Sequence, residues 1–498
     1  MSAITNLDEF MSSFAQEGLT FDDVSLETCY SDVLPVDTDV SSRFSRRIGL
    51  NIPFVAAAMD TVTESEMAIA LALLGGIGVI HKNLTPARQA AEVSRVKHYL
   101  NGLIADPVAF PQSIRVSELL ETKAKNQYKF AGFPIVDDER KLAGIITARD
   151  IKFLTSYDVP VTEAMTADLI TAREGTTLTE AFEIMVGHKV GKLPIVDASG
   201  RLVGLYSFSD VRSIIENMEP AFNRDEHHQL RVAAAVGTRD DERIAALVDA
   251  GVDALVVDTA HGHSRGVIET VRSLKRDYPA VDVVAGNIAT GEGALALAKA
   301  GADAVKVGVG PGSICTTRVV AGVGVPQVTA VYRARKAVGD DVPVIADGGI
   351  SYSGDAAKAL AVGASSCMMG SALAGTEESP GERILRHGRT FVVYRGMGSL
   401  DAMQSSKGSR ERYQADIAEP DKLVPQGIEG LVPYRGRVAD VLHQFVGGLR
   451  YSLGYLGANS LEELRHRARL VRISSASLQE AHPHDVQIAK EAPNYQSD

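Results

Sequence analysis

The sequence predicts an α/β protein, a (β/α)8 barrel of the TIM type, with a second domain inserted into it. Two observations lead to this prediction. Continuously apolar runs alternate with helical patterns eight times along the 498-residue chain, and such runs are typical of parallel strands buried on both faces. Between residues 106 and 220 a segment that repeats within itself interrupts the alternation. A doubly wound sheet is the alternative, because counting βα units does not establish closure.

The eight strands are expected in chain order, each followed by a helix. Two of them precede the interruption, so the barrel is divided into residues 1–105 and 221–498. Helical patterns such as ERIAALVDAG and DAAKALAVGA lie between the later strands. The expected strands are 52–59, 76–81, 230–237, 254–260, 282–288, 304–310, 343–350 and 366–374.

The interrupting segment contains two copies of one β-β-α unit, at about 106–165 and 166–220. FPIVDDERKLAGIITARD at 133–150 aligns without a gap with LPIVDASGRLVGLYSFSD at 193–210. Since neither copy belongs to the barrel pattern, the pair is expected to fold as a separate domain.

Composition excludes several classes of function. The chain is 45% hydrophobic and 23% charged, as in soluble globular proteins. A net charge of −12 with scattered basic residues argues against a specific nucleic-acid partner. The three cysteines, Cys29, Cys315 and Cys367, are far apart and predict a reducing compartment. No apolar stretch reaches the ~20 residues that a membrane helix needs, and the first residues lack a signal-peptide pattern. We expect a cytoplasmic protein.

Polar residues gather where the barrel strands are expected to end, which is where such barrels hold their active sites. Glycines after the seventh and eighth strands suit a phosphate, because their backbone N–H groups approach it closely. A carboxylate beside them can accept both hydroxyls of a ribose. These features predict a nucleoside monophosphate or a similar sugar phosphate as substrate. The residues are Asp258, Asn287, 308–315, Asp347 with Gly348 and Gly349, Gly370 with Ser371, and the turn YRGMGSL at 394–400.

Cys315 is the candidate nucleophile, because it follows a glycine-rich strand end where a ligand can reach the sulfur. A thiol of pKa ~8.5 is only slightly ionised at neutral pH but is intrinsically nucleophilic. Cys29 and Cys367 are interpreted as core thiols in apolar surroundings and are expected to be inert.

Five motifs in this order resemble the inosine-5′-monophosphate dehydrogenase family: GVGPGSICTTR, DGGI, MGSALAGTEESPGE, YRGMGSLDAM and VPQGIEGLVPYRG. The resemblance runs from GLTFDDVSL near the start to HPHDVQI near the end. The family's fold is the barrel with the insertion described above.

The repeat resembles a tandem CBS module, or Bateman domain, whose grooves bind purine nucleotides such as ATP and GTP. The first copy ends in the family's T-x-R-D pattern, with Thr147 and Asp150, whereas the second has Ser207 and Asp210 with no arginine between them. A spacer or assembly surface without a ligand is the alternative.

The family resemblance implies NAD-dependent oxidation of IMP to XMP, the rate-limiting step of guanine nucleotide biosynthesis. Cys315 would attack C2 of the hypoxanthine ring, hydride would pass from C2 to NAD⁺, and water would hydrolyse the covalent thioimidate. Thr317 would lie near C2 and the water. A mobile flap at about 399–437, carrying Arg412 and Tyr413, would enter the vacated NAD site and activate the water.

The resemblance also implies binding residues, homotetramers, and octamers formed through the CBS modules. Gln426 stands where many bacterial members carry glutamate. IMP is expected at Ser313, Asp347, Gly348, Gly349, Gly370, Ser371, Tyr394, Arg395, Gly396, Met397, Gly398 and Gln426. NAD is expected at Asp258, Asn287, Gly308, Val309 and Gly310. A potassium ion is expected at the carbonyls of Gly308, Gly310 and Cys315, with Glu480, Ala481 and His482 of the partner subunit.

Two alternative functions are considered. GMP reductase shares the barrel and the cysteine loop, but the long flap and the CBS insertion favour the dehydrogenase. A nucleotide sensor with a catalytically silent barrel is the second alternative. The presence of Cys315, Asp347, Arg412 and Tyr413 argues against it.

Overall fold

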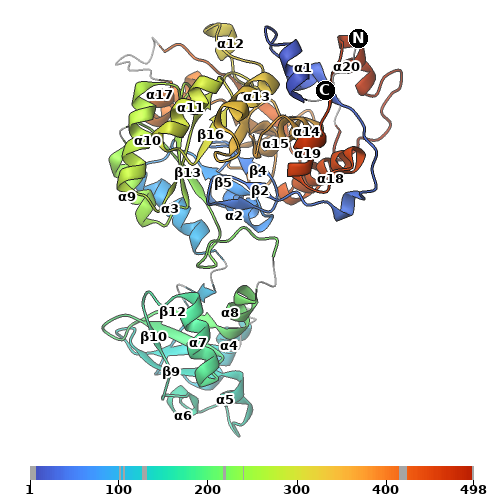
Figure 1. Ribbon diagram of the computed structural model, residues 1–498. Helices are drawn as coiled ribbons and strands as arrows, with labels where there is room; N and C mark the ends of the chain where they lie inside the picture. Colours follow the sequence, from blue (N-terminus) through green and yellow to red (C-terminus); the bar gives the residue numbers. More distant parts are fainter. Residues whose placement is uncertain are drawn as a thin grey trace. The chain divides into compact units, whose positions relative to one another are not determined.

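The computed structural model describes residues 7–99, 102–104, 107–125, 132–216, 220–238, 240–413 and 423–495. The chain divides into two compact units. One comprises Met1–Lys97, Ala221–Asn223 and Leu230–Asp498, and the other comprises His98–Pro220 and Arg224–Gln229. The smaller unit is coloured cyan to green in Figure 1.

The larger unit is a closed barrel of eight parallel strands in the order β13-β14-β15-β16-β17-β18-β4-β5. Closure confirms the predicted (β/α)8 fold over the doubly wound sheet. Every predicted strand is present. β15 matches its predicted range, and the other seven are shorter than their apolar runs because residues at one or both ends of each run lie in loops. The strands are β4 (Phe54–Ala56), β5 (Ile77–Ile80), β13 (Ala233–Val236), β14 (Ala254–Asp258), β15 (Asp282–Ile288), β16 (Ala304–Val307), β17 (Val344–Asp347) and β18 (Ser366–Met369).

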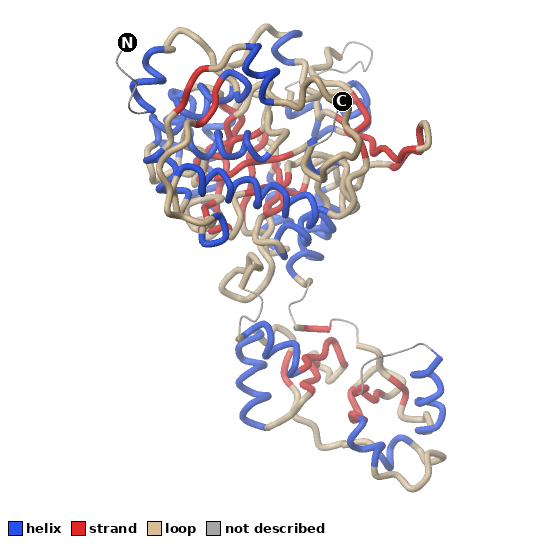
Figure 2. Tube along the Cα trace, turned by 90° about the vertical axis from the view of Figure 1, so that its right-hand side faces the viewer, coloured by secondary structure: helices blue, strands red, loops and turns tan. Residues whose placement is uncertain are grey.

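Helices surround the barrel strands, as the blue and red segments of Figure 2 show. Most strands are followed by one long helix; β16 is first followed by the short α12 (Thr317–Val320), and β18 by the short α15 (Ser371–Ala374). The outer helices are α2 (Ser65–Leu73), α3 (Pro86–Lys97), α9 (Asp241–Asp249), α10 (Arg265–Asp277), α11 (Gly291–Ala300), α13 (Gln327–Val338), α14 (Ser353–Ala361) and α18 (Val438–Leu456).

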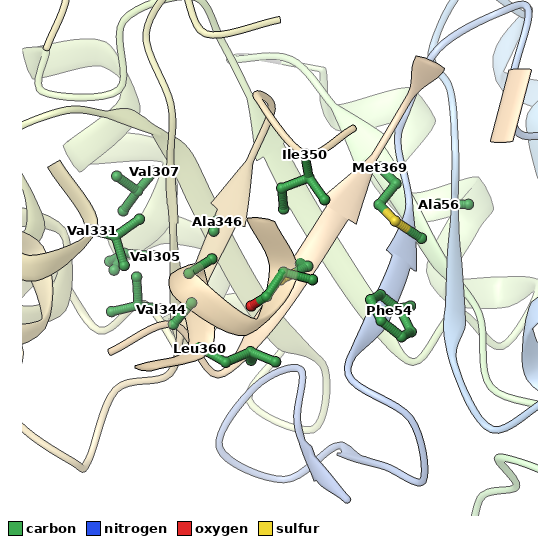
Figure 3. Packing of buried hydrophobic residues seen from close by; sticks show 14 of the residues in the cluster. Phe54, Ala56, Val305, Val307, Val331, Val344, Ala346, Ile350, Leu360 and Met369 are labelled. Carbon is green, nitrogen blue, oxygen red and sulfur yellow. The ribbon is translucent and has the colours of Figure 1, made fainter. Parts of the chain in front are cut away.

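The core has two layers, because alternate residues of each strand face opposite sides of the barrel wall. Val305 and Val307 face outward and belong to the same cluster as Val331 of α13 (Figure 3). Burying such a valine contributes about 1.5 kcal/mol or more. Ala304 belongs to the cluster inside the barrel. Lys306, between Val305 and Val307, is therefore directed into the barrel interior.

The smaller unit consists of two similar halves. One sheet has the order β7-β8-β9 and the other β10-β11-β12-β6. In both halves the central hairpin has the same register, with a bulge at Ile135/Val136 in one and at Ile195/Val196 in the other. This equivalence matches the sequence repeat. The elements are β6 (Leu103–Ile104), β7 (Phe110–Pro111), α4 (Val116–Lys125), β8 (Gly132–Val136), β9 (Leu142–Thr147), α5 (Ala148–Lys152), α6 (Val161–Ala164), β10 (Ala172–Arg173), α7 (Leu178–His188), β11 (Lys192–Val196), β12 (Leu202–Ser207) and α8 (Phe208–Ile215).

Further elements of the larger unit frame the carboxyl ends of the barrel strands. β19 (Arg383–Arg386), β20 (Arg389–Arg395) and β21 (Glu429–Pro433) form an antiparallel sheet, and α16 (Leu400–Ser405) and α17 (Lys407–Arg412) follow β20. Within the described ranges, no helix is long and apolar enough to span a membrane. The remaining elements are α1 (Leu7–Ser13), β1 (Val24–Leu26), β2 (Ser42–Arg43), β3 (Gly49–Leu50), α19 (Leu461–Arg467), β22 (Leu470–Arg472) and α20 (Ser475–Ala481).

Candidate active site

A cleft with a cavity of about 130 Å³ lies at the carboxyl ends of the barrel strands. Nineteen of the residues predicted above line it. They are Asp258, Asn287, Gly308, Val309, Gly310, Ser313, Cys315, Thr317, Asp347, Gly348, Gly349, Gly370, Ser371, Tyr394, Gly396, Met397, Arg412, Tyr413 and Gln426.

Cys315 lies in the loop after β16, where it is half-buried. Its Sγ is 3.1 Å from Thr317 Oγ1 and 3.7 Å from the carbonyl oxygen of Gln426. The loop can pass the end of β17 because residue 308 is glycine: a Cβ there would lie 2.0 Å from the Asp347 carbonyl oxygen. The thiol therefore has a hydroxyl neighbour and opens into the cleft.

A buried network of charges forms the floor of the cleft. Lys306, which is 1% exposed, places Nζ 3.0 Å from Asp258 Oδ1 and 2.6 Å from Asp347 Oδ2. Lys306 Nζ also donates to Asn287 Oδ1. Asn287 Nδ2 donates to Asp347 Oδ2 at 2.8 Å and to the carbonyl of Gly308 at 2.7 Å. The positive charge of Lys306 thus offsets the negative charges of Asp258 and Asp347, whose carboxylates face the cleft.

The sequence prediction missed two buried lysines of this region. Lys306 lies within the apolar run AVKVGVG, and an isolated lysine in a buried strand requires a partner; that signal could have identified it. Lys82 follows β5 and donates to the backbone carbonyl of Asp258 at 3.0 Å. Burial, with the positive charge of Arg412 as the next cause, lowers the pKa of Lys82 to about 7.

The described part of the flap covers the cleft. Arg412, at the end of α17, forms an ion pair with Asp258, and its carbonyl oxygen accepts from the backbone of Ala260 at 3.0 Å. The backbone carbonyl of Gln426 accepts a hydrogen bond from the backbone N–H of Thr316 at 3.0 Å. Residues 414–422 of the predicted flap lie outside the described residues.

The two flap side chains in the cleft are deeply buried. Desolvation lowers the pKa of the Arg412 guanidinium, and its neighbour Tyr413 opposes that shift. Desolvation also raises the pKa of the Tyr413 phenol, which the charge of Arg412 opposes. The interior favours the neutral form of Arg412, whereas the Asp258 carboxylate favours the charged form.

Tyr394 lies at the end of the cleft that holds Gly370 and Ser371. Burial raises the pKa of its phenol, and a hydrogen bond with Ser313 opposes this. A Cβ on Gly370 would lie 2.6 Å from the phenol oxygen, so glycine permits this close approach. Tyr394 is therefore uncharged and can donate to an anion.

Five predicted residues do not line the cleft. Arg395 turns to Asp60, with a 2.8 Å ion pair, and Gly398 packs under the ring of Tyr413. Glu480, Ala481 and His482 lie at the end of α20, where the His482 ring contacts those of Tyr352 and Tyr495.

The fold and the cleft together define a (β/α)8-barrel protein in which a candidate cysteine nucleophile shares one cleft with Arg412 and Tyr413. The IMP dehydrogenase / GMP reductase domain model matches residues 18–484. The chain is 57% identical to inosine-5′-monophosphate dehydrogenase of Aquifex aeolicus, covering 96% of this chain and 98% of the relative. It is 51% identical to the protein of the same name from Halalkalibacterium halodurans, covering 97% and 99%. This chain belongs to the IMP dehydrogenase / GMP reductase family.

A solved structure from the other branch of the family is also similar. GMP reductase of Trypanosoma brucei, crystallised as a cysteine-to-alanine variant with guanosine 5′-monophosphate, is 39% identical with a TM-score of 0.78. The match covers 94% of this chain and 98% of that one, so it includes most of the inserted unit. The insertion therefore does not separate the dehydrogenase from the reductase, and the flap remains as the discriminating feature.

Proposed function

We propose that this protein is an NAD-dependent IMP dehydrogenase, which oxidises IMP to XMP in guanine nucleotide biosynthesis. The observation that carries the mechanism is that Cys315 of the barrel and Arg412 of the flap line one cleft. A nucleophile for the oxidation and a candidate base for hydrolysis are then available at the same substrate atom. The names of the relatives support the same reaction.

In the first half of the reaction, Cys315 Sγ adds to C2 of the purine and its proton passes to N3. N3 releases that proton to solvent as the hydride leaves C2. Thr317 Oγ1, 3.1 Å from Sγ, is close enough to orient the thiol proton. The hydrogen at C2 leaves with its electron pair, and NAD⁺ supplies the hydride acceptor when it is bound. A thioimidate on Cys315 remains, and a thiol is also a good leaving group in the second half.

The substrate is oriented by the network beneath it. Asp347, held by Lys306 and Asn287, accepts hydrogen bonds from the ribose hydroxyls. Tyr394 and the glycine-rich ends of β17 and β18 donate to the phosphate. Met397 and Gln426, from the flap side, lie against the base.

In the second half, the flap holds Arg412 where it activates water. Water adds to C2, its proton passes to Arg412 once that side chain has lost its own proton, and the C2–S bond breaks to release XMP. Asp258 fits the ribose of the nicotinamide half, because its carboxylate faces the cleft and accepts hydroxyl donors. When the flap is closed, Arg412 forms an ion pair with the Asp258 carboxylate. The flap and the cosubstrate therefore bind to Asp258 in turn and not together.

A potassium ion is proposed at the cysteine loop. The backbone carbonyls of Gly308, Gly310 and Cys315 are suitable oxygen ligands. The Gly308 carbonyl accepts from Asn287 but has a second lone pair. Glu480, Ala481 and His482 of the partner subunit would complete the set in a homotetramer.

The inserted unit is proposed as a CBS module that binds ATP and GTP and pairs tetramers into octamers. In the described structure, Asp150 caps α5, accepting from Thr147 N at 2.7 Å. Lys192 donates to Ser207 in the second copy at 2.8 Å. Thr147 with Asp150, and Ser207, lie at the strand-to-helix turns after β9 and β12, which are the proposed nucleotide sites.

The direct test is the absorbance of NADH with IMP and NAD⁺, with and without K⁺. Accumulation of NADH supports the proposal. GMP reductase is the second candidate because of its 39% identical structure; it would instead consume NADPH with GMP and release ammonia. Absence of both activities would favour a silent, nucleotide-sensing barrel.

A further inference from the structure

The flap helix α17 rests on the loop after β5. Gly408 lies so close to this loop that a Cβ would be 2.6 Å from the carbonyl oxygen of Lys82. The next residue, Ser409, is completely buried. Its hydroxyl requires a partner in that position, since an unsatisfied buried hydroxyl is costly.

Asn83 is the partner of Ser409. Asn83 Nδ2 is 3.0 Å from Ser409 Oγ, and Ser409 Oγ donates to Asn83 Oδ1 at 3.1 Å. The serine thus contacts both ends of one amide. These residues are 326 positions apart in the chain, so the bonds exist only when the flap lies on the barrel.

Asp60 fixes the orientation of the Asn83 amide. Asn83 Nδ2 donates to Asp60 Oδ2 at 2.7 Å, and an ionised carboxylate only accepts. Asp60 is itself held by Arg395 Nη2 at 2.8 Å. The amide therefore presents a fixed donor and a fixed acceptor to Ser409. Ser409 lies three residues before Arg412 in α17.

We infer that Asn83, oriented by Asp60, is the positioning residue that holds the flap closed through Ser409 and so places Arg412 in the cleft. This role rests on the proposed dehydrogenase function, in which closure permits hydrolysis and excludes NAD⁺. Loss of the contact favours the open flap. Hydrolysis then slows, while NAD⁺ competes more strongly for Asp258.

The test compares Asn83→Ala, Ser409→Ala and the double variant with Ser405→Ala, a matched serine on α16 whose hydroxyl donates to the Ala402 carbonyl of its own helix. Each single variant should slow steady-state turnover about tenfold. NAD⁺ should also inhibit each single variant at a concentration about tenfold lower than it inhibits the parent. The initial NADH burst should stay within about twofold of the parent. The double variant should resemble the singles, because they remove the same contact. Ser405→Ala should behave as the parent.

Unchanged turnover and NAD⁺ inhibition in both single variants would overturn the inference, as would additive losses or an equally slowed burst. A parent protein that makes no NADH from IMP would contradict the proposed function instead. In that case, amide hydrogen exchange over residues 407–413 decides the positioning role by itself. Faster exchange in Asn83→Ala than in Ser405→Ala supports it, and equal exchange overturns it.

Discussion

Arg412 of the flap and Asp258 of β14 form an ion pair in which the side chains are 14% and 2% exposed. The carboxylate is also 3.0 Å from Lys306 Nζ, so it is shared between the barrel and the flap. In the proposed mechanism, opening the flap would remove one cation from Asp258 and leave the other. The carboxylate would then exchange the Arg412 guanidinium for the hydroxyls of the cosubstrate.

Cys315→Ala should bind IMP but produce no NADH from IMP and NAD⁺, because hydride leaves C2 only after the sulfur has added. IMP binding is measured by calorimetry and NADH by absorbance. Cys29→Ala, which removes a thiol outside the cleft, should retain the parent's rate. More than trace NADH from the purified Cys315 variant would falsify the nucleophile assignment.

Lys306→Met should destabilise the barrel and abolish activity. The methionine fills a similar volume but leaves Asp258 and Asp347 without their buried cation, and breaking a buried pair in this way costs about 3–5 kcal/mol. Urea unfolding measures the change. Lys299→Met, on the surface helix α11, is the control and should change the free energy of unfolding by about 0.5 kcal/mol or less. A comparably small effect at position 306 would mean that the network is not needed for stability.

The barrel could be predicted because its strands are long apolar runs, and the cleft because its glycines and carboxylates follow those runs directly. Lys306 could have been identified as a lone lysine in an apolar run, whereas no local pattern marks Lys82, which lies between His81 and Asn83. The contact between Asn83 and Ser409 could not be predicted, because no local pattern reveals which loop a flap will meet. Arg395 was assigned to substrate by its motif, yet its side chain pairs with Asp60.

Replacing residues 106–220 by a short linker should leave the NADH-forming activity largely intact and remove any response to ATP or GTP. The described barrel strands all lie outside this segment, and they close without it. Titrating each nucleotide against both proteins provides the measurement. A shortened protein that still responds as the parent does would place the regulatory site elsewhere.

Raising the pH through about 7 should favour the closed flap. The pKa of Lys82 is lowered to about 7 chiefly by burial and next by Arg412, with Arg243 also lowering it and Glu411 and Asp240 opposing. Closing the flap brings Arg412 beside Lys82, and its lowering effect on the Lys82 pKa is larger than the opposing effect of Glu411. The open state therefore has the higher Lys82 pKa and binds more protons, so closure gains stability as the pH rises from about 7. Inhibition by NAD⁺ should therefore weaken above pH 7.

The control for this pH dependence is Lys82→Met, which cannot titrate at that position. It should keep the same NAD⁺ inhibition from pH 6 to 9. Loss of the pH dependence in the variant would assign it to Lys82. A variant that retains the parent's pH profile would show that another group is responsible.

Arg412→Ala should spare the first half of the reaction far more than the second. Without the guanidinium, the sulfur still adds and hydride still leaves, but water is no longer activated. Mixing the variant with IMP and NAD⁺ should give about one equivalent of NADH per active site and then very slow turnover. The adduct on Cys315 should accumulate and be visible by mass spectrometry of the intact protein after acid quench. Arg410→Ala removes a guanidinium of the same helix that does not line the cleft, and it should retain turnover without adduct. If the burst itself disappears in Arg412→Ala, the arginine acts before or during hydride transfer and its hydrolytic role is wrong.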